Sequence, residues 1–144
     1  MGIFKGSVLI VDDEESTRRM LLHALSRECY YCVTASSTLD ALDKSVMSDF
    51  DVVLLNATMQ GTSVIDVLPR FKERCHDTQV IMVVSSLDSS KAVEKSMHLG
   101  AYDYITKPLN IPDLVLRVES AMASKSLTPD KKQPANSRVK PLTP

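Results

Sequence analysis

Aromatic residues are scarce in this sequence: they make up 5% of its 144 residues, and tryptophan is absent. Aliphatic side chains must therefore dominate the core. Long apolar runs are also missing, since no stretch approaches the about 20 apolar residues of a membrane-spanning helix, and the amino terminus lacks the basic flank and apolar core of a secretion signal. With 44% apolar residues, the chain has the composition of one soluble domain with a single core, which we expect to be cytoplasmic.

Cysteine is rare too, with three residues, Cys29, Cys32 and Cys75. Cys29 and Cys32 form a C-x-x-C pair, a spacing that occurs in redox and metal sites. A thioredoxin-like pair opens a helix, whereas this pair enters a predicted strand, where residues three apart point to opposite faces. No second cysteine or histidine pair lies nearby to complete a zinc site. We therefore interpret the cysteines as structural, reduced thiols.

Charge is unevenly distributed along the chain. Residues 1–123 carry 12 basic and 17 acidic residues, a net charge of −5, whereas residues 124–144 carry five basic residues and one acid, a net charge of +4. The final segment is also rich in proline and has no apolar period, so we expect a flexible linker or tail after a domain that spans 1–123. The acidic domain argues against direct binding of nucleic acid.

Five short runs of strand-forming apolar residues alternate with five amphipathic helical patterns. This alternation predicts an α/β fold, with a doubly wound parallel sheet and helices on both faces. Right-handed crossovers then place the carboxyl ends of all strands at one edge of the sheet. The predicted strands span residues 8–11, 31–35, 52–55, 80–84 and 102–105.

The helical patterns carry apolar residues at i, i+3 and i+4. Ser37 and Asn110 are predicted to cap the second and fifth helices. Pro69 removes one hydrogen bond from the third helix, so it predicts either a kink there or a helix that begins close to the proline. The predicted buried stripe of the second helix consists of Leu39, Leu42 and Val46.

The polar residues that end these strands point to one site. Asp12 and Asp13 follow the first run, Asn56 follows the third, and Ser85 follows the fourth. Lys107, which precedes Pro108, follows the fifth. In open α/β sheets the carboxyl ends of the strands form the ligand site, so we expect these residues to meet there with the Asn56 amide at the centre.

The motifs VLIVDDEE at 8–15, DVVLL before position 56, VIMVVS ending at Ser85 and GAYDYITKPL at 100–109 together resemble the receiver domain of bacterial response regulators, over about residues 5–123. The resemblance implies a flavodoxin-like (βα)5 fold with strand order 2-1-3-4-5. It also implies two-component signalling, in which an aspartate receives a phosphoryl group from a histidine kinase when Mg²⁺ is present.

The same resemblance assigns roles to individual residues. Asp13, with Asp12 through water and the Thr58 carbonyl, would bind Mg²⁺, which prefers oxygen ligands. Lys107 would offset the charge of a transferring phosphoryl group, and Ser85 would donate its hydroxyl to a phosphoryl oxygen. Tyr104 matches the switch aromatic of the family; an ordinary half-buried strand aromatic is the alternative. The bond from Lys107 to Pro108 is expected to be cis.

The sequence departs from the family at the decisive position, because Asn56 stands where the phosphorylated aspartate belongs. An amide has no negative charge and a far weaker lone pair than a carboxylate, so aspartyl-phosphate chemistry should fail. Gln60 also replaces the usual proline of that loop, and Val64 a common glycine. We expect Mg²⁺ to bind weakly, and Lys107 to pair with Asp12 or Asp13.

These observations favour a non-enzymatic pseudo-receiver that works in a phosphorelay through protein–protein interaction. The expected partners are a sensor histidine kinase, an output domain or protein, or a second copy bound through the fourth helix, fifth strand and fifth helix. We expect no membrane partner. An ordinary response regulator with an engineered aspartate-to-asparagine change at position 56 is the first alternative. A flavodoxin-like flavin carrier is the second, but the acids after the first strand would repel a phosphate.

Overall fold

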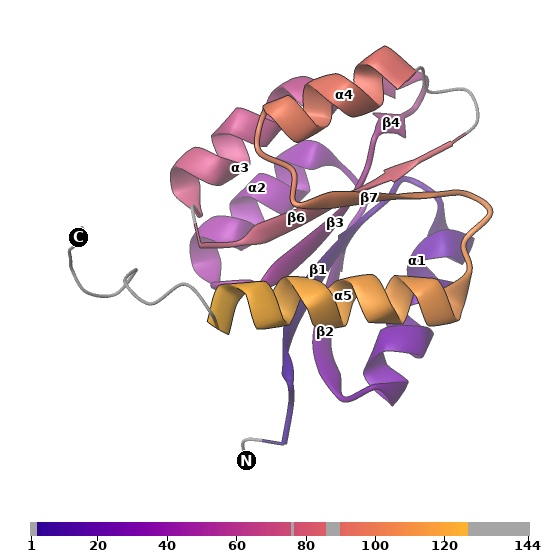
Figure 1. The fold of residues 1–144 in the computed structure, drawn as a ribbon, viewed down its shortest axis with the longest axis vertical. Coiled ribbons are helices and arrows are strands. Elements are labelled where there is room, and N and C mark those ends of the chain that lie inside the picture. The colour runs from indigo at the N-terminus through magenta and orange to yellow at the C-terminus, as the bar shows by residue number, and fades with distance from the viewer. Residues whose placement is uncertain (1–2, 76, 86–89, 127–144) are drawn as a thin grey trace.

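The computed structural model of the protein describes residues 3–75, 77–85 and 90–126. Five of its strands form one parallel sheet in the order β2-β1-β3-β6-β7, drawn in Figure 1. Counted along the chain as the five strands of this sheet, that is the predicted order 2-1-3-4-5, so the predicted fold class is confirmed. The strands are β1 Gly6–Val11, β2 Tyr30–Ala35, β3 Val52–Asn56, β6 Gln79–Val84 and β7 Asp103–Thr106.

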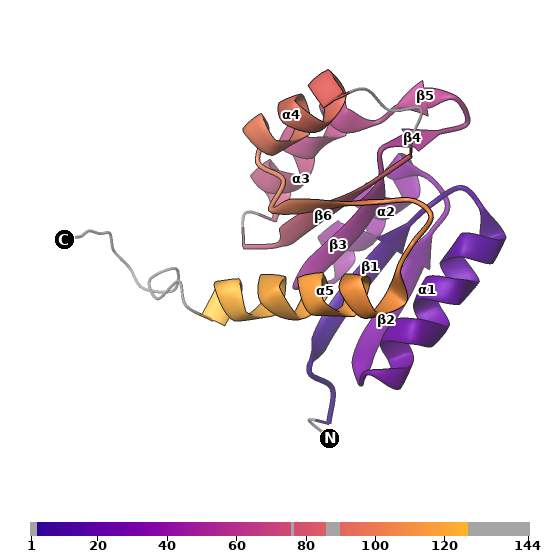
Figure 2. The same cartoon turned by 45° about the vertical axis from the view of Figure 1, so that its right-hand side comes forward.

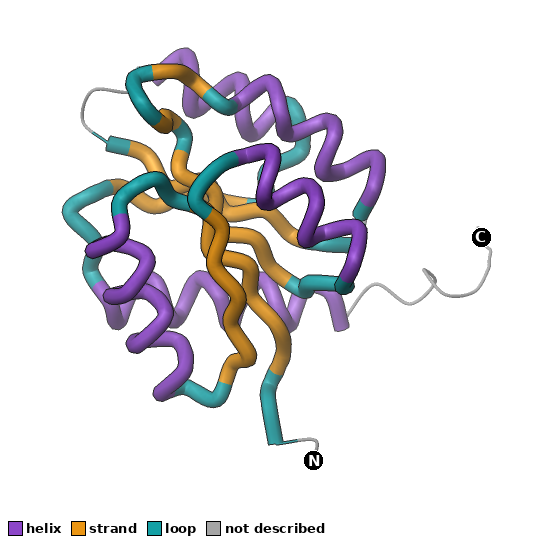
Figure 3. Tube along the Cα trace, turned by 180° about the vertical axis from the view of Figure 1, so that it is seen from behind, coloured by secondary structure: helices purple, strands orange, loops and turns teal. Residues whose placement is uncertain are grey.

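Helices cover both faces of the sheet, as Figures 1 and 3 show from opposite sides. The side chains of β1 divide between two cores: Leu9 and Val11 point to one, and Val8 and Ile10 to the other. This division follows from the alternation of side chains along a strand. Both cores are apolar, so the central strands carry uninterrupted apolar runs. The helices are α1 Glu15–Arg27, α2 Thr38–Met47, α3 Leu68–Arg74, α4 Ser90–His98 and α5 Ile111–Ser126. Within the described residues, none of them is long and apolar enough to cross a membrane.

Local signals in the sequence set the helix ends. The Ser37 hydroxyl accepts a hydrogen bond from the Asp40 backbone N–H at 3.1 Å, and the Asn110 side chain accepts one from the Asp113 N–H at 2.9 Å. Both predicted caps are therefore confirmed. Pro69 is the second residue of α3, which follows a short 3₁₀ helix, η1, at Ile65–Val67. Of the two alternatives for Pro69, the structure shows a helix that begins beside it, where its missing N–H has no helical partner to lose.

The fifth helix extends beyond the predicted domain boundary at Ala123, because α5 ends at Ser126. Its last turn is held by side chains. The Lys125 ammonium donates to the Asp51 carboxylate at 2.8 Å, and Asp51 also accepts the Ser7 backbone N–H at 2.9 Å. Burial of the Asp51 carboxyl opposes its ionisation, but these hydrogen bonds and the Lys125 charge lower its pKa. The predicted tail from residue 127 onward lies outside the described residues.

The predicted buried stripe of α2 is wrong at two of its three positions. Leu42 is buried, but Leu39 is 69% exposed and Val46 is 65% exposed. The small residues Ala41 and Ser45 take the inward positions beside Leu42. The Ser45 hydroxyl satisfies its hydrogen-bonding need within the helix, since it donates to the Leu42 carbonyl at 2.8 Å. The helix is thus rotated so that Leu42 faces the core, while Leu39, Val46 and Met47 face outward.

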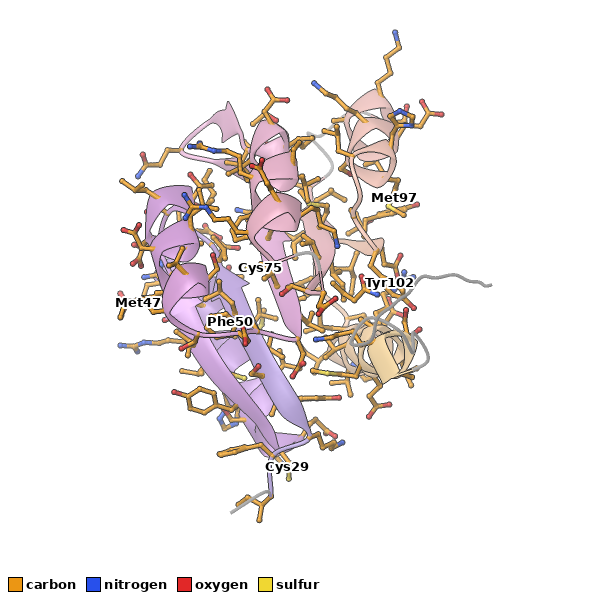
Figure 4. All side chains as sticks on the ribbon, turned by 90° about the vertical axis from the view of Figure 1, so that its left-hand side faces the viewer. Cys29, Met47, Phe50, Cys75, Met97 and Tyr102 are labelled. Atoms are coloured by element: carbon orange, nitrogen blue, oxygen red, sulfur yellow. The ribbon has the colours of Figure 1, made fainter. Side chains whose placement is uncertain are left out.

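The three cysteines are free thiols. Cys29 is exposed and immediately precedes β2, while Cys32 lies within that strand. Cys75, which follows α3, lies well apart from Cys29 (Figure 4). Burial raises the pKa of the Cys32 thiol, so its reactive thiolate is disfavoured.

The orientation of α2 is tested by two matched substitutions on the same helix. Leu42→Ala should cost about 2–5 kcal/mol of unfolding free energy, because it leaves a cavity in a packed core. Leu39→Ala should change the unfolding free energy by no more than about 0.5 kcal/mol, because that side chain is exposed. Urea denaturation of both variants measures the difference. Equal losses would contradict this orientation of the helix.

Candidate functional site

The candidate site lies where the strands of the sheet end. The chain leaves β1 at Asp12 and Asp13, Asn56 is the last residue of β3, and Lys107 follows β7 directly. The β3 strand pairs with β1 on one side and with β6 on the other. The predicted convergence of these residues is therefore present, with Asn56 at the centre of the sheet.

Asp12 is the buried charge of the site, with 2% of its surface exposed. One carboxylate oxygen accepts the Glu14 backbone N–H at 2.9 Å, and the other lies 3.3 Å from the Lys107 ammonium. The pKa of Asp12 is raised because burial disfavours the charged form, and this effect outweighs the opposing Glu14 hydrogen bond and Lys107 charge. The predicted pairing of Lys107 with one of the two acids is confirmed, and its partner is Asp12.

Asp13 also receives a donor on each carboxylate oxygen. The Gln60 backbone N–H donates to one oxygen at 2.8 Å, and the Asn56 side-chain nitrogen lies 3.5 Å from the other. The same nitrogen donates to the Thr58 carbonyl at 2.9 Å. One amide group, 7% exposed, thus links the end of β1 to the loop that follows β3. All four oxygens of the acid pair have donors within the protein.

The loop after β3 contains a small hairpin that the sequence did not reveal. Its strands are β4, Thr58–Met59, and β5, Thr62–Ser63, labelled at the end of the sheet in Figure 2. Gln60 and Gly61 form the turn with φ values of 52° and 75°. Positive φ at both central residues is the geometry of a tight two-residue hairpin turn. This conformation directs the Gln60 backbone N–H at Asp13. Residues other than glycine rarely adopt a positive φ, so the site uses a residue in an uncommon backbone conformation. The dipeptide Gln-Gly is a weak form of the Asn-Gly turn signal.

Ser85 and Tyr104 border a neighbouring hollow. Together with Val93, Met97 and Thr106 they line a cavity of about 560 Å³ between α4 and the end of the sheet. Tyr104 is 41% exposed, so its ring is not enclosed there. The Lys107–Pro108 peptide bond is cis, as expected.

The oxygen ligands expected for Mg²⁺ are present at one place but already engaged. Asp12, Asp13 and the Thr58 carbonyl are hard oxygen donors of the kind that Mg²⁺ prefers. Each of them accepts a hydrogen bond from within the protein. Across the described part of the chain, no group of three or more histidine, cysteine, aspartate or glutamate side chains could hold a metal ion. The two acids supply two carboxylates to such an ion.

The pairing of Lys107 with Asp12 should stabilise the fold. Lys107→Met should lower the unfolding free energy at neutral pH by about 1–3 kcal/mol, because it leaves a buried carboxylate without its cation. The loss should shrink as the pH falls below the raised pKa of Asp12, because a protonated carboxyl needs no counter-charge. Urea denaturation at neutral and acidic pH measures this. In an Asp12→Asn background Lys107→Met should cost little, and an undiminished cost there would show that the pairing is not the cause.

Comparison with known proteins identifies the family. The response regulator receiver domain model matches residues 8–119. The chain is 33% identical over 121 residues to the transcriptional regulatory protein ResD of Bacillus subtilis, which covers 84% of this chain and 50% of ResD. It is 34% identical over 118 residues to the phosphate regulon regulator PhoB of Pseudomonas aeruginosa, covering 81% of this chain and 51% of PhoB. It thus spans about half the length of these curated relatives.

Solved structures of other proteins have the same fold as this chain. The beryllofluoride-activated NtrC4 receiver domain dimer superposes with a TM-score of 0.77 at 28% identity, over 83% of this chain and 98% of that one. NtrX from Brucella abortus gives a TM-score of 0.79 at 27% identity, over 85% of this chain and 28% of NtrX. With the family model, which matches residues 8–119, these likenesses show that the chain belongs to the response regulator receiver domain family.

Proposed function

We propose that this receiver domain is a signalling module of a two-component phosphorelay that is not phosphorylated at position 56 and acts through protein–protein interaction. The observation that carries the proposal is the hydrogen bond from the Asn56 side-chain nitrogen to the Thr58 carbonyl. The phospho-acceptor of the family is an aspartate, and Asn56 stands in its place at the end of β3.

The surroundings of Asn56 fix which of its side-chain atoms faces the acids. A backbone carbonyl and a carboxylate can only accept hydrogen bonds, so the atom that faces Thr58 and Asp13 must be the amide nitrogen. A nitrogen whose lone pair is delocalised into the amide cannot attack phosphorus. The side chain therefore serves as a hydrogen-bond donor between two elements. A phosphoryl acceptor at position 56 would have to be a carboxylate oxygen.

Mg²⁺ is expected to bind this site weakly. When bound, it would be held by Asp13, by Asp12 through water and by the Thr58 carbonyl, and would neutralise negative charge there. Two carboxylates attract a dication less than the three that an acceptor aspartate would provide. The Asn56 amide already donates to the Thr58 carbonyl at 2.9 Å. The ion must therefore displace internal hydrogen bonds as well as shed water.

The partners that we propose are a sensor histidine kinase, an output domain or protein, or a second copy of the chain. The relatives ResD and PhoB are transcriptional regulatory proteins, and the matched segment is about half of each of them; the NtrC4 receiver forms a dimer. The face formed by α4, β7 and α5 exposes Met97, Tyr104 and Leu116, as an interaction surface would. Tyr104 is the proposed switch residue of that face. We assign no enzymatic turnover to the domain.

A phosphodonor experiment tests this proposal directly. After incubation with acetyl phosphate and Mg²⁺, the protein should show no phosphoryl adduct by intact-mass spectrometry, because position 56 offers no carboxylate oxygen to displace acetate from phosphorus. Asn56→Asp is the matched comparison. Its continued inertness would favour a pseudo-receiver, whereas uptake restored by this one change would favour an ordinary regulator with an altered acceptor. Phosphorylation of the unaltered chain at Asn56 or Ser85 would overturn the proposal.

A titration with Mg²⁺ tests the metal site separately. The unaltered protein should bind the ion no more tightly than the millimolar range, and Asn56→Asp should bind it more tightly because it adds a third carboxylate. Isothermal titration calorimetry, or chemical shifts of the Asp13 and Thr58 amides, gives both affinities. Tighter, sub-millimolar binding by the unaltered protein would contradict this description of the site.

A further inference from the structure

The outer face of α2 carries large apolar side chains in water. Leu39 is 69% exposed, Val46 65% and Met47 83%, and Figure 4 shows Met47 at the outer side of this helix. These positions and Asp43 lie at i, i+4, i+7 and i+8, so they form one stripe along the helix. We call these four residues the α2 stripe. Single exposed apolar residues are ordinary, but three on one face of a ten-residue helix form a patch.

The inward side of α2 carries different side chains from the α2 stripe. The helix buries Ala41, Leu42 and Ser45 against the sheet, two of which are small. Packing against β1 and β2 therefore uses Leu42 and two small residues, while the other large apolar side chains of the helix face outward. Folding of the domain does not explain a large apolar side chain at position 47, because the exposed Met47 side chain buries no apolar surface in the core. The α2 stripe has the composition of a surface that another helix covers.

The apolar surface continues beyond the carboxyl end of α2. Tyr31 and Ala35 share one face of β2, because side chains alternate along a strand. Ala35 packs in the core on the α2 side, so Tyr31 points to that side as well, near the amino end of β2. Tyr31 is 51% exposed and contacts the Phe4 ring edge-to-face, with ring centroids 5.6 Å apart.

Charge on the α2 stripe indicates which partner it fits. Asp43 is the charged residue in the middle of the stripe and is exposed. Within the described part of the chain, no ion pair to Asp43 is recorded, whereas Asp40 on the adjacent side pairs with Lys44 at 3.2 Å. A second copy related by a twofold axis would bring Asp43 against its own equivalent, which like charge disfavours. A cation opposite Asp43 removes that conflict.

We propose that the α2 stripe docks an α-helix of a partner protein whose apolar residues flank a central lysine or arginine. Leu39 contacts one end of that helix, Val46 and Met47 contact the other, and the cation faces Asp43. This mode is the helix-to-helix recognition by spaced apolar anchors that amphipathic segments use. The proposal does not depend on the chemistry of Asn56, and the stripe lies on a different helix from the α4, β7 and α5 face.

Two designed helical peptides probe the chemistry of the stripe on the full chain. Both carry leucines at i, i+4 and i+8 of one face, and they differ by a lysine or a glutamate placed between the leucines. Isotope-labelled protein is titrated with each, and amide shifts report where and how tightly it binds. The lysine peptide should shift the α2 amides and bind about five- to tenfold more tightly than the glutamate peptide.

Three variants make the result specific. Asp43→Lys should reverse the preference, so that the glutamate peptide binds more tightly. Val46→Lys should weaken binding of the lysine peptide by about tenfold or more, because it puts a charge into the apolar contact. Met20→Lys is the control: this apolar residue is 42% exposed on α1, outside both the α2 stripe and the α4, β7 and α5 face, and its substitution should leave binding unchanged.

The following outcomes would overturn the proposal. They are no binding of either peptide at α2, equal affinities for the two peptides, or equal weakening by Met20→Lys. Self-association that Val46→Lys abolishes in analytical ultracentrifugation would make a second copy the occupant. Changed α2 amide shifts in the free protein after Lys131→Glu with Lys132→Glu would make the basic final segment the occupant.

Discussion

Two adjacent carboxylates at the end of a buried strand must be neutralised, and the rest of the site is arranged to do this. Asp12 is almost fully enclosed, so leaving its charge without partners would be costly. Its donors come from the start of the first helix and from Lys107, 95 residues further along the chain. Asp13 takes its donors from the end of β3 and from the hairpin turn. The charge pair therefore ties together three regions that are distant in sequence, at residues 12–14, at 56–60 and at Lys107.

Asn56 changes the requirements of this charge pair. An aspartate at the same place would bring a third negative charge close to two others, and a site of that kind needs a cation to be stable. The amide contributes an N–H donor, which faces the Thr58 carbonyl and Asp13. The acid pair is then satisfied by the protein alone.

The sequence was sufficient to predict the sheet, its order and the meeting of Asp12, Asn56 and Lys107, because buried parallel strands carry unbroken apolar runs and end at one edge. The sequence was insufficient to predict which face of α2 is buried. Leu39, Leu42 and Val46 satisfy a helical period as well as Ala41, Leu42 and Ser45 do, and the space available beneath the helix, which the sequence does not show, favours the smaller set. The β4–β5 hairpin was missed because its two-residue strands are too short to show alternation. The hydrogen bond from Asn56 to the Thr58 carbonyl is made to that hairpin, so the sequence could not predict it either.

The self-contained site and the apolar face of α2 are compatible parts of one molecule. A phosphorylation switch works by changing the relative stability of two conformations, and a site whose acids are satisfied internally has less to gain from such a change. A docking face on a helix does not need a second conformation, since its affinity comes from side chains that are already exposed. Leu39, Val46 and Met47 lie on a helix that is anchored by Leu42 and capped by Ser37, so the proposed docking would not require this helix to form on binding. In our proposal the scaffold of the family binds partners through such a face, while the hydrogen bonds at the edge of the sheet hold that scaffold together.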